Sequence, residues 1–412
     1  MEVLHARCAG LDISKKDAKV CVRVAGSGRR KTVETVTTWS SMTRDVLALR
    51  EHLSTEKVTC VVMEATGDYW KTFYYVLEDG PFELMLVNAR DVKNLPGRKT
   101  DVSDAAWLAQ LAAHGLVRPC FVPPPPIRQL RDLTRTRTAI TRERGRTIQR
   151  VEKVLEDAGI KLSVVATDIA GVSGQRILRA LANGERNPEV LADLSVRQLR
   201  AKIPMLTQAL EGRFTDHHAF IIDMHLTSIE EHTTHIDALT ERIEQLMAPF
   251  RDIRELLCTI PGIAEGTADV IIAETGADMT VFPDAGHLAS WAGVCPGHHE
   301  SAGRVKNAAT RPGNRYLKGA LGASALTIAR NKGTFLHTKY VRLSKQRGQG
   351  KAIVAIERTL ITLIWTMITN HTTYTEPGPD FYQQRNPERA KNRALQQLRD
   401  LGWEATLQPA SA

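Results

Sequence analysis

Four acidic residues stand where predicted strands end and a predicted helix begins, and this placement favours metal-ion chemistry. Asp12 follows a short apolar run, and Glu64 ends a Val-rich run that is typical of a strand buried on both faces. Asp101 and Asp104 lie three residues apart at a helix start, which places both on one helix face. Carboxylates that meet at the carboxyl ends of neighbouring strands repel one another unless a cation lies between them. We therefore predict a site for Mg²⁺ or Mn²⁺, which prefer oxygen ligands and can promote phosphodiester cleavage.

Each acid also has an ordinary structural interpretation. An Asp that follows a strand is a common turn residue, and Asp101 could cap the helix that begins beside it. Spacing alone leaves both interpretations open for each acid. Their shared position at strand ends and at a helix start favours the metal site.

A second group of residues could attack phosphorus. Ser301 lies among small residues in the segment 297–304, and several cationic residues follow it closely. A serine hydroxyl can act as a nucleophile, and nearby cations would stabilise the charge that develops on the phosphoryl group. These cations are Arg304, Lys306, Arg315 and Lys318. The structural alternative is that Ser301 is an ordinary loop or capping residue.

The first 120 residues alternate between strand-like and helix-like patterns. Strands are predicted over 5–13, 19–24, 32–39, 57–63 and 82–87, and helices over 43–53, 68–77 and 103–113. Strands mixed with helices in this order indicate an α/β sheet domain. The run Pro123–Pro126 cannot continue a helix and marks the clearest boundary in the chain.

The segment after the prolines predicts one long, strongly basic helix over 127–158. It carries nine Lys or Arg residues between Ile127 and Lys153 against three acidic residues, which is most of the chain's net charge of +9. Like charges on one helix repel unless a polyanion accepts them, so we expect contacts with the phosphates of RNA or DNA. A solvated face with paired charges is the alternative. The expected phosphate contacts are Arg128, Arg131, Arg135, Arg142, Arg146 and Arg150.

A second long helix is predicted over 203–250, and its heptad-like apolar spacing indicates a coiled-coil arm. The two long helices could pair within one chain or between chains. Beyond residue 256 short helices are predicted, and the turn at 258–263 resembles a helix-hairpin-helix that binds phosphate. The expected domains are an α/β domain over 1–122, a basic helix and coiled-coil region over 123–255, a helical domain over 256–380 that carries Ser301, and a charged tail over 381–412.

Composition limits the class of protein further. The chain has 412 residues, of which 42% are hydrophobic, and this excludes wholesale disorder. No run of about 18 apolar residues predicts a membrane span, and the first residues reach an acidic residue too early for a secretory signal peptide. Six scattered cysteines favour reduced thiols over a disulfide framework. We expect a cytoplasmic protein that acts on nucleic acid and has no membrane partner.

Motifs in both halves of the chain form an ordered series. In the first half they are Gly10–Lys16, Met63–Trp70 and Val87–Leu116. In the second half they are Ile260–Ile263, Trp291–Pro296, Glu300–Gly303, Pro312–Leu317 and Arg347–Arg358. In this order they resemble the DEDD-type insertion-sequence transposases, the insertion-sequence one-ten family, which also includes the Piv/MooV-like DNA invertases. The resemblance covers roughly residues 5 to 376.

The resemblance implies an N-terminal RuvC-like domain of ribonuclease-H fold, in which the four acids bind the metal ions. It also implies a coiled-coil dimerisation arm and a mostly helical C-terminal transposase domain with Ser301 as nucleophile. Members of this family are recombinases guided by a structured non-coding RNA, the bridge RNA, which pairs with donor and target DNA. The serine forms a covalent 5′-phosphoserine link to DNA, and composite sites form across a tetramer. The family commonly has glycine after the serine, where this chain has Ala302.

The leading hypothesis is a transposase or site-specific DNA recombinase of an insertion sequence. It would act as a dimer or tetramer with DNA and guide RNA in the nucleoid of a prokaryote. One alternative is a RuvC-like nuclease that hydrolyses DNA junctions without serine chemistry. Another is a non-catalytic nucleic-acid-binding protein, although the presence of all four acids argues against it.

Overall fold

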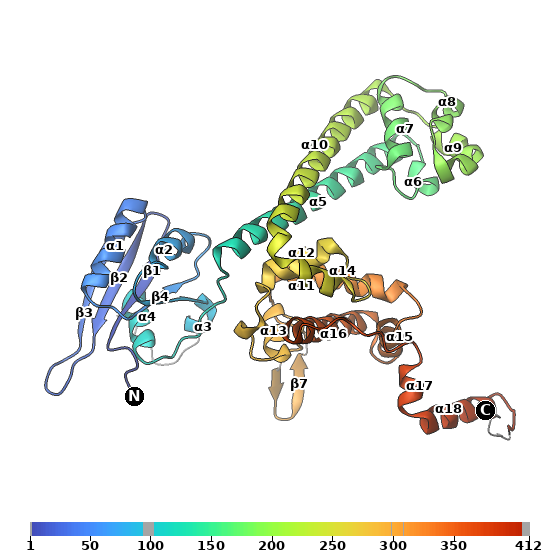
Figure 1. The fold of residues 1–412 in the computed structure, drawn as a ribbon. Coiled ribbons are helices and arrows are strands. Elements are labelled where there is room, and N and C mark those ends of the chain that lie inside the picture. The colour runs from blue at the N-terminus through green and yellow to red at the C-terminus, as the bar shows by residue number, and fades with distance from the viewer. Residues whose placement is uncertain (1, 94–102, 298, 308, 406–412) are drawn as a thin grey trace. The chain divides into compact units, whose positions relative to one another are not determined.

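The computed structural model describes residues 2–93, 103–297, 299–307 and 309–405. The chain divides into two compact units, residues 1–122 and residues 123–412 (Figure 1). The division lies immediately before the proline run, whose last two residues form the first turn of the next helix, where no intrahelical N–H donor is needed. We call these parts unit 1 and unit 2 and describe each by itself.

Unit 1 is a five-stranded sheet with helices on both faces, which confirms the predicted α/β class. Its strands are β1 (Arg7–Ile13), β2 (Asp17–Val24), β3 (Val33–Ser40), β4 (Cys60–Glu64) and β5 (Glu83–Val87). Its helices are α1 (Thr43–Thr55), α2 (Trp70–Leu77), α3 (Ala89–Lys93) and α4 (Asp104–Ala113). The strand order is β3-β2-β1-β4-β5. The pairs β1–β2 and β2–β3 are antiparallel, and β1–β4 and β4–β5 are parallel.

The two faces of the sheet have separate hydrophobic cores because strand side chains alternate in direction. On one face Leu11, Val61 and Met63 pack with residues of α1 and α2. On the other face Cys60 and Val62 pack with residues of α4. Gly10 permits the close contact of α4 with β1, because a Cβ at Gly10 would lie 2.2 Å from the carbonyl oxygen of Ala105. This contact fixes the start of α4 against β1.

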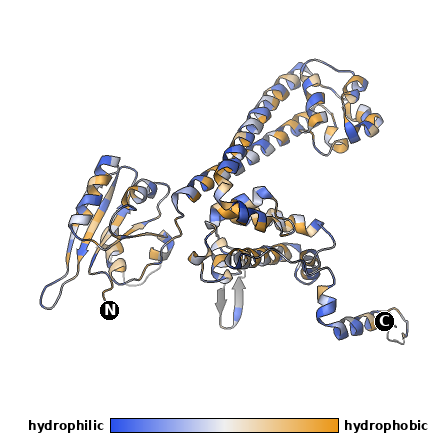
Figure 2. Ribbon diagram, viewed as in Figure 1, coloured by the Kyte–Doolittle hydropathy of each residue, from blue (hydrophilic) through white to orange (hydrophobic). Residues whose placement is uncertain are grey.

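Unit 2 begins with an arm of two long antiparallel helices that pack side by side in the same chain (Figure 1). They are α5 (Pro125–Asp157) and α10 (Asp216–Met247), and hydrophobic and hydrophilic residues alternate along both (Figure 2). Small helices close the end of the arm around a shared hydrophobic core. These are α6 (Leu162–Val165), α7 (Val172–Ala182), α8 (Pro188–Asp193), η1 (Arg197–Lys202) and α9 (Ile203–Leu210).

The single helix predicted over 203–250 is wrong at its beginning. The structure has a short helix, α9, followed by a break and then α10. Gly212 packs against Ala158 at the break, and the backbone N–H of Arg213 donates to the carbonyl of Ala158 (2.7 Å). Thr215 and His218 then form a capping box that starts α10. The pairing of α5 with α10 also settles that the two long helices pack within one chain.

Among its described residues, the rest of unit 2 is helical apart from one hairpin. Its elements are η2 (Ala248–Phe250), α11 (Arg251–Cys258), α12 (Glu265–Thr275), η3 (Met279–Val281), α13 (Ala285–Ala292), β6 (His299–Ser301), β7 (Arg304–Asn307), α14 (Arg315–Arg330), α15 (Phe335–Arg347), α16 (Gln349–Asn370), α17 (Phe381–Arg385) and α18 (Pro387–Asp400). The turn predicted at 258–263 lies between α11 and α12.

In the described part of the chain, one helix, α16, is long and apolar enough to cross a membrane by length and composition. The structure packs α16 against α11, α13, α14 and α15, and its buried residues include Ile356, Leu360 and Ile364. These contacts give α16 the position of a core helix within unit 2.

Candidate functional site

The acidic end of the sheet in unit 1 is built by strand register. Leu11 of β1 pairs with Met63 of β4, so Asp12 and Glu64 are the next residues on two adjacent parallel strands. Side chains two or four residues apart on a strand lie on the same face of the sheet. Asp12 is two residues after Gly10 and Glu64 is four residues after Cys60, so both acids lie on the sheet face covered by α4. The structure therefore brings the backbones of Asp12 and Glu64 to one point, as the strand-end argument predicts.

Asp104 enters the same region through α4. It is the first residue of this helix, and Ser103 provides the N-cap by accepting a hydrogen bond from the backbone N–H of Ala106 (3.3 Å). The helix contacts β1 at Gly10, two residues before Asp12. Asp101, the fourth predicted acid, lies outside the described residues. The cap of α4 is thus a serine.

The donors at this end of the sheet fit a hard divalent cation. Asp12 and Glu64 are half-buried, Asp104 is exposed, and each offers carboxylate oxygens. The carboxylates of these three acids do not all lie within 4.8 Å of one another. Binding one ion by all three acids would therefore require their side chains to rotate inward. Clustered like charges favour that rotation once a cation is present.

Ser301 occupies the tip of a hairpin in unit 2. It ends β6 and pairs with Arg304, the first residue of β7, across the two-residue turn Ala302-Gly303. Both turn residues have positive φ, 52° at Ala302 and 72° at Gly303, as a type I′ turn requires. This geometry gives the residue after the serine a conformation that suits glycine better than alanine. Arg304 is exposed beside the turn, and Lys306 lies further along β7.

The base of this hairpin, which we call the neck, is closed by backbone contacts. Pro296 and Thr310 form an isolated antiparallel bridge, and the N–H of Gly297 donates to the carbonyl of Ala309 (2.9 Å). Below them Gly313 approaches Ala292 so closely that a Cβ would lie 2.4 Å from its carbonyl carbon. The neck is therefore rigid, and the hairpin extends away from the surrounding helices (Figure 1).

Two side chains from neighbouring helices hold opposite strands of the neck. Lys318 of α14 donates from Nζ to Oγ1 of Thr310 (2.8 Å). Arg358 of α16 donates from Nη1 to Sγ of Cys295 (2.6 Å), next to Pro296. Lys318, predicted as a phosphate contact, thus has a structural partner as well. These contacts transmit the position of α14 and α16 to the serine hairpin.

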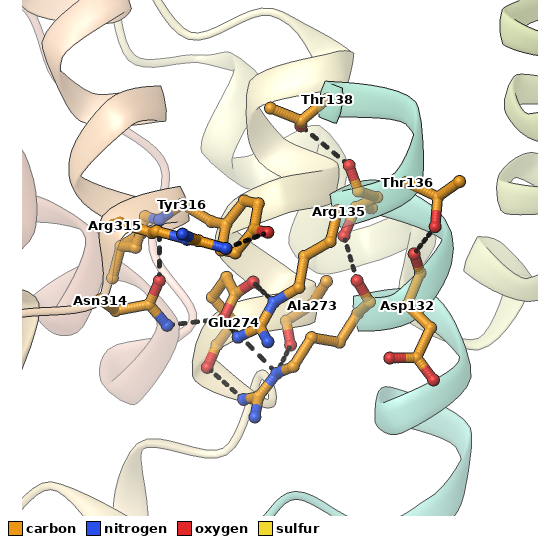
Figure 3. A network of polar contacts seen from close by, with 12 residues as sticks. Asp132, Arg135, Thr136, Thr138, Ala273, Glu274, Asn314, Arg315 and Tyr316 are labelled. Atoms are coloured by element: carbon orange, nitrogen blue, oxygen red, sulfur yellow. Dashed lines mark hydrogen bonds and ion pairs between the residues drawn. The ribbon is translucent and has the colours of Figure 1, made fainter. Parts of the chain in front are cut away.

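A buried carboxylate, Glu274 of α12, joins the basic helix to the start of α14 (Figure 3). Arg135 donates two hydrogen bonds to it (2.7 and 2.8 Å), and Nδ2 of Asn314 donates a third (2.5 Å). Arg131 donates to the backbone carbonyl of Glu274 (2.7 Å). Asn314 also caps α14, because its Oδ1 accepts hydrogen bonds from the backbone N–H groups of Tyr316 and Leu317. Sequence reasoning missed Glu274, whose only signal is an acidic residue in an apolar helix.

A second buried carboxylate, Asp269, reinforces the same junction. Arg137 of α5 donates to Oδ2 of Asp269 (2.9 Å), and Nε of Arg254 lies 3.0 Å from Oδ1. Burial raises the pKa of Asp269, and the hydrogen bond from Arg137 opposes that rise. Arg254 also pairs with Glu244 of α10 (2.5 Å). Helices α5, α10, α11 and α12 are thereby tied together through ion pairs.

The predicted phosphate contacts on α5 separate into two groups. Arg131 and Arg135 face Glu274, and Arg128 donates to the carbonyl of Pro123 (2.6 Å), so these guanidinium groups have protein partners. The exposed group, which we call the α5 arginine row, is Arg142, Arg146 and Arg150. Its members are spaced by four residues on one helix face and form no ion pair with any described residue. Arg315 is exposed and stacks on Tyr316.

Comparisons with known proteins match both units. Residues 9–160 match a family model described as transposase, and residues 254–340 match one described as transposase of the IS116/IS110/IS902 family. The chain is 35% identical over 129 residues to a 43.6 kDa protein of insertion element IS110 from Streptomyces coelicolor, covering 30% of this chain and 31% of that protein. It is 33% identical over 117 residues to the pilin gene-inverting protein of Moraxella bovis, covering 27% and 36%.

A longer alignment covers nearly the whole chain. Over 379 residues the chain is 24% identical to the transposase for insertion sequence element IS1111A of Coxiella burnetii. This alignment covers 89% of this chain and 90% of that protein. The first two relatives, in contrast, are matched over about a third of their own length. Family matches over residues 9–160 and 254–340, together with this alignment, place the chain in the IS110 family of transposases.

Proposed function

We propose that this protein is a transposase or site-specific recombinase that cleaves and rejoins DNA strands of an insertion sequence. The observation that carries the proposal is the register of β1 with β4, which places Asp12 beside Glu64. Both lie on the sheet face covered by α4, whose first residue is Asp104. An acidic cluster at the carboxyl ends of parallel strands suits phosphodiester chemistry with divalent ions. Family membership supplies the DNA substrate.

We assign unit 1 to the RuvC-like ribonuclease-H fold that the motif resemblance implies. The support is a mixed sheet in which three antiparallel strands precede two parallel ones, with helices on both faces. The acids occupy one end of this sheet. Mg²⁺ or Mn²⁺ held by Asp12, Glu64, Asp101 and Asp104 would polarise the scissile phosphate and stabilise the leaving oxygen.

Ser301 is the proposed nucleophile. Its oxygen forms a bond to phosphorus, the bond from phosphorus to the 3′ oxygen breaks, and the DNA leaves with a 3′ hydroxyl. The serine proton passes to a base, and the leaving oxygen takes up a proton. A later attack by a 3′ hydroxyl on the phosphoserine reverses these bonds and needs no nucleotide cofactor. Arg304, across the strand pair from Ser301, is suited to stabilise negative charge at the phosphorus.

The α5 arginine row is the proposed contact for nucleic-acid phosphates, and the partners proposed are donor DNA, target DNA and a structured guide RNA. Three arginines at four-residue spacing project from one face of a long helix. The arm of α5 and α10 is the proposed dimerisation element, and the acids of one protomer would act with the serine of another in a dimer or tetramer. The site of action is then the nucleoid of a prokaryote.

The experiment that tests the serine chemistry uses labelled DNA from the ends of the element, its flanking non-coding transcript and Mg²⁺. The native protein should form a protein–DNA adduct that survives denaturation and disappears on proteolysis. Ser301→Ala should abolish the adduct, and Glu64→Gln should reduce it strongly. Strand cleavage with no adduct, unchanged in Ser301→Ala, would instead establish the hydrolytic nuclease. Adduct formation without added transcript would remove the guide RNA from the proposal.

A further inference from the structure

A second group of metal-type ligands lies at the opposite end of the sheet face that carries Asp12 and Glu64. His5 precedes β1, Cys60 begins β4 and Glu83 begins β5. One ligand atom from each of these three side chains lies within 4.8 Å of the other two. Across the described residues this is the one trio of His, Cys, Asp or Glu side chains with that property.

The sheet itself holds these three residues in place. Cys60 and Glu83 are register partners on adjacent parallel strands, so their side chains leave the same face side by side. The backbone N–H of Glu83 donates to the carbonyl of Thr59 (2.9 Å), and the N–H of His5 donates to the carbonyl of Ala113 (3.2 Å). Ligands on strands and their anchored ends are more precisely placed than ligands on free loops.

The donor set selects the kind of ion. A thiolate and an imidazole are poor ligands for Mg²⁺ but suit Zn²⁺, which also accepts a carboxylate oxygen. Zinc bonds of about 2.0–2.3 Å place neighbouring ligand atoms roughly 3.5 Å apart. Nε2 of His5 and Oε2 of Glu83 are already 3.9 Å apart, so small side-chain rotations close the set.

Burial and exposure also fit an ion that enters from solvent. The Cys60 side chain is fully buried, whereas the side chains of His5 and Glu83 are 22% and 54% exposed. Three protein ligands leave a fourth position, which faces solvent and suits a water molecule. Burial raises the pKa of the Cys60 thiol to about 12, and the neighbouring carboxylate of Glu83 adds to the rise.

We propose that His5, Cys60 and Glu83 bind one Zn²⁺ ion, in a site separate from the acidic end of the sheet. On binding, the thiol proton leaves to solvent and a Zn–S bond forms, with no redox change. Cys60 and Glu64 are four residues apart on β4, so the two sites are separated by roughly 13 Å. The zinc ion would join the segment before β1 to the first residues of β4 and β5, and its role is to stabilise unit 1.

The test uses the full-length protein, freed of metal with a chelator and titrated with Co²⁺, which reports thiolate ligation by near-ultraviolet absorption. We expect a cobalt–thiolate band that saturates at one equivalent and is displaced by Zn²⁺. Loss of an outer-shell partner alone typically weakens metal binding 10–100-fold, so His5→Ala and Glu83→Gln should each weaken it at least about tenfold. Both side chains are partly exposed, and their loss leaves the core intact.

Matched cysteine variants locate the thiolate. Cys60→Ser should remove the band. Cys8→Ser should keep it, because the thiol of Cys8, the register partner of Cys60 on β1, donates to the carbonyl of Ala109 (3.1 Å). Cys258→Ser, in unit 2, should also keep it. Absence of a band in the native protein, or a band unaffected by both His5→Ala and Glu83→Gln, would overturn the zinc site. Neither result bears on the serine chemistry, which the adduct experiment measures.

Discussion

Arg135 of α5 and the fully buried Glu274 of α12 form an ion pair with two hydrogen bonds of 2.7 and 2.8 Å. This pair fixes the basic helix α5 to α12. Asn314 completes the link, because it binds Glu274 and caps α14. A displacement of α5 by bound nucleic acid would therefore be transmitted to the neck that carries Ser301.

Breaking this pair should destabilise unit 2 strongly. Arg135→Met leaves a buried carboxylate with fewer donors, and we expect a loss of about 2–3 kcal/mol in the free energy of unfolding. Arg135→Met with Glu274→Leu should cost less than the sum of the two single changes, because neither Arg135 nor Glu274 is then left as a charge without the other. Urea unfolding of the four proteins measures the coupling energy. Strictly additive single and double values would show that the pair is energetically unimportant.

Glu357 gives unit 2 a dependence of stability on pH. It is 6% exposed on α16, its Oε2 accepts no hydrogen bond from any described residue, and burial raises its pKa while the charge of Lys318 opposes the rise. Because its pKa is raised in the folded state, the protonated Glu357 stabilises the fold, and this stabilisation is fully present at a pH below 4.5, the ordinary pKa of the group. That stabilisation is lost as the pH rises through the folded pKa.

The variant Glu357→Gln does not titrate, so it isolates this effect. The free energy of unfolding of the native protein minus that of the variant should fall as the pH increases from 4.5 to 8. Circular dichroism in urea at each pH gives the values. A difference that rises with pH would mean that Glu357 is ionised and paired in the fold.

Local patterns predicted the strands and the strand-end acids because burial and alternation are properties of neighbouring residues. The Val-rich run before Glu64 and the helical spacing of apolar residues in α4 are both patterns within one element. The break before α10 was missed because the apolar spacing continues past Gly212, whereas the contacts of Gly212 and Arg213 with Ala158 depend on tertiary packing.

Roles that depend on distant partners could not be read from spacing. Arg131 and Arg135 belong to a basic helix and were expected to bind phosphates, yet both contact Glu274, which lies about 140 residues further along the chain. A charge count over one helix contains no information about the helix that packs on it. The α5 arginine row differs from Arg131 and Arg135 in that its side chains are exposed, whereas those two contact Glu274 of α12. Residue spacing along α5 does not show which of its arginines another helix covers.

The turn beside Ser301 is strained, and glycine should relieve it. Ala302 has φ of 52°, a left-handed conformation that costs a residue with a Cβ about 1 kcal/mol. Ala302→Gly should therefore be neutral or stabilising in thermal unfolding and should keep adduct formation. The matched control is Ala323→Gly, on the exposed side of α14, which should destabilise by about 0.5–1 kcal/mol. Equal destabilisation by both changes would exclude strain at Ala302.

The contact between Arg358 and Cys295 should matter for rate more than for DNA affinity. Arg358 positions the neck through Sγ of Cys295, and a misplaced nucleophile can lose up to about a hundredfold in rate. We expect Arg358→Ala to slow phosphoserine formation roughly tenfold or more with unchanged DNA binding. Cys295→Ser, whose hydroxyl still accepts the hydrogen bond, should rescue most of the rate that Cys295→Ala loses. Equal rates in those two cysteine variants would show that the contact does not position Ser301.

The α5 arginine row should set the salt dependence of nucleic-acid binding. Each phosphate neutralised by a cation contributes about −0.9 to the slope of log K against log salt for duplex DNA. Replacing Arg142, Arg146 and Arg150 with Gln should therefore make the slope less steep by up to about 2.7. Arg44→Gln, which removes an arginine with a 95% exposed side chain from α1, is the control for general charge. Fluorescence anisotropy at several salt concentrations supplies both slopes. A slope that changes equally in the control and the triple variant would mean that the row makes no specific phosphate contacts and that binding follows net charge alone.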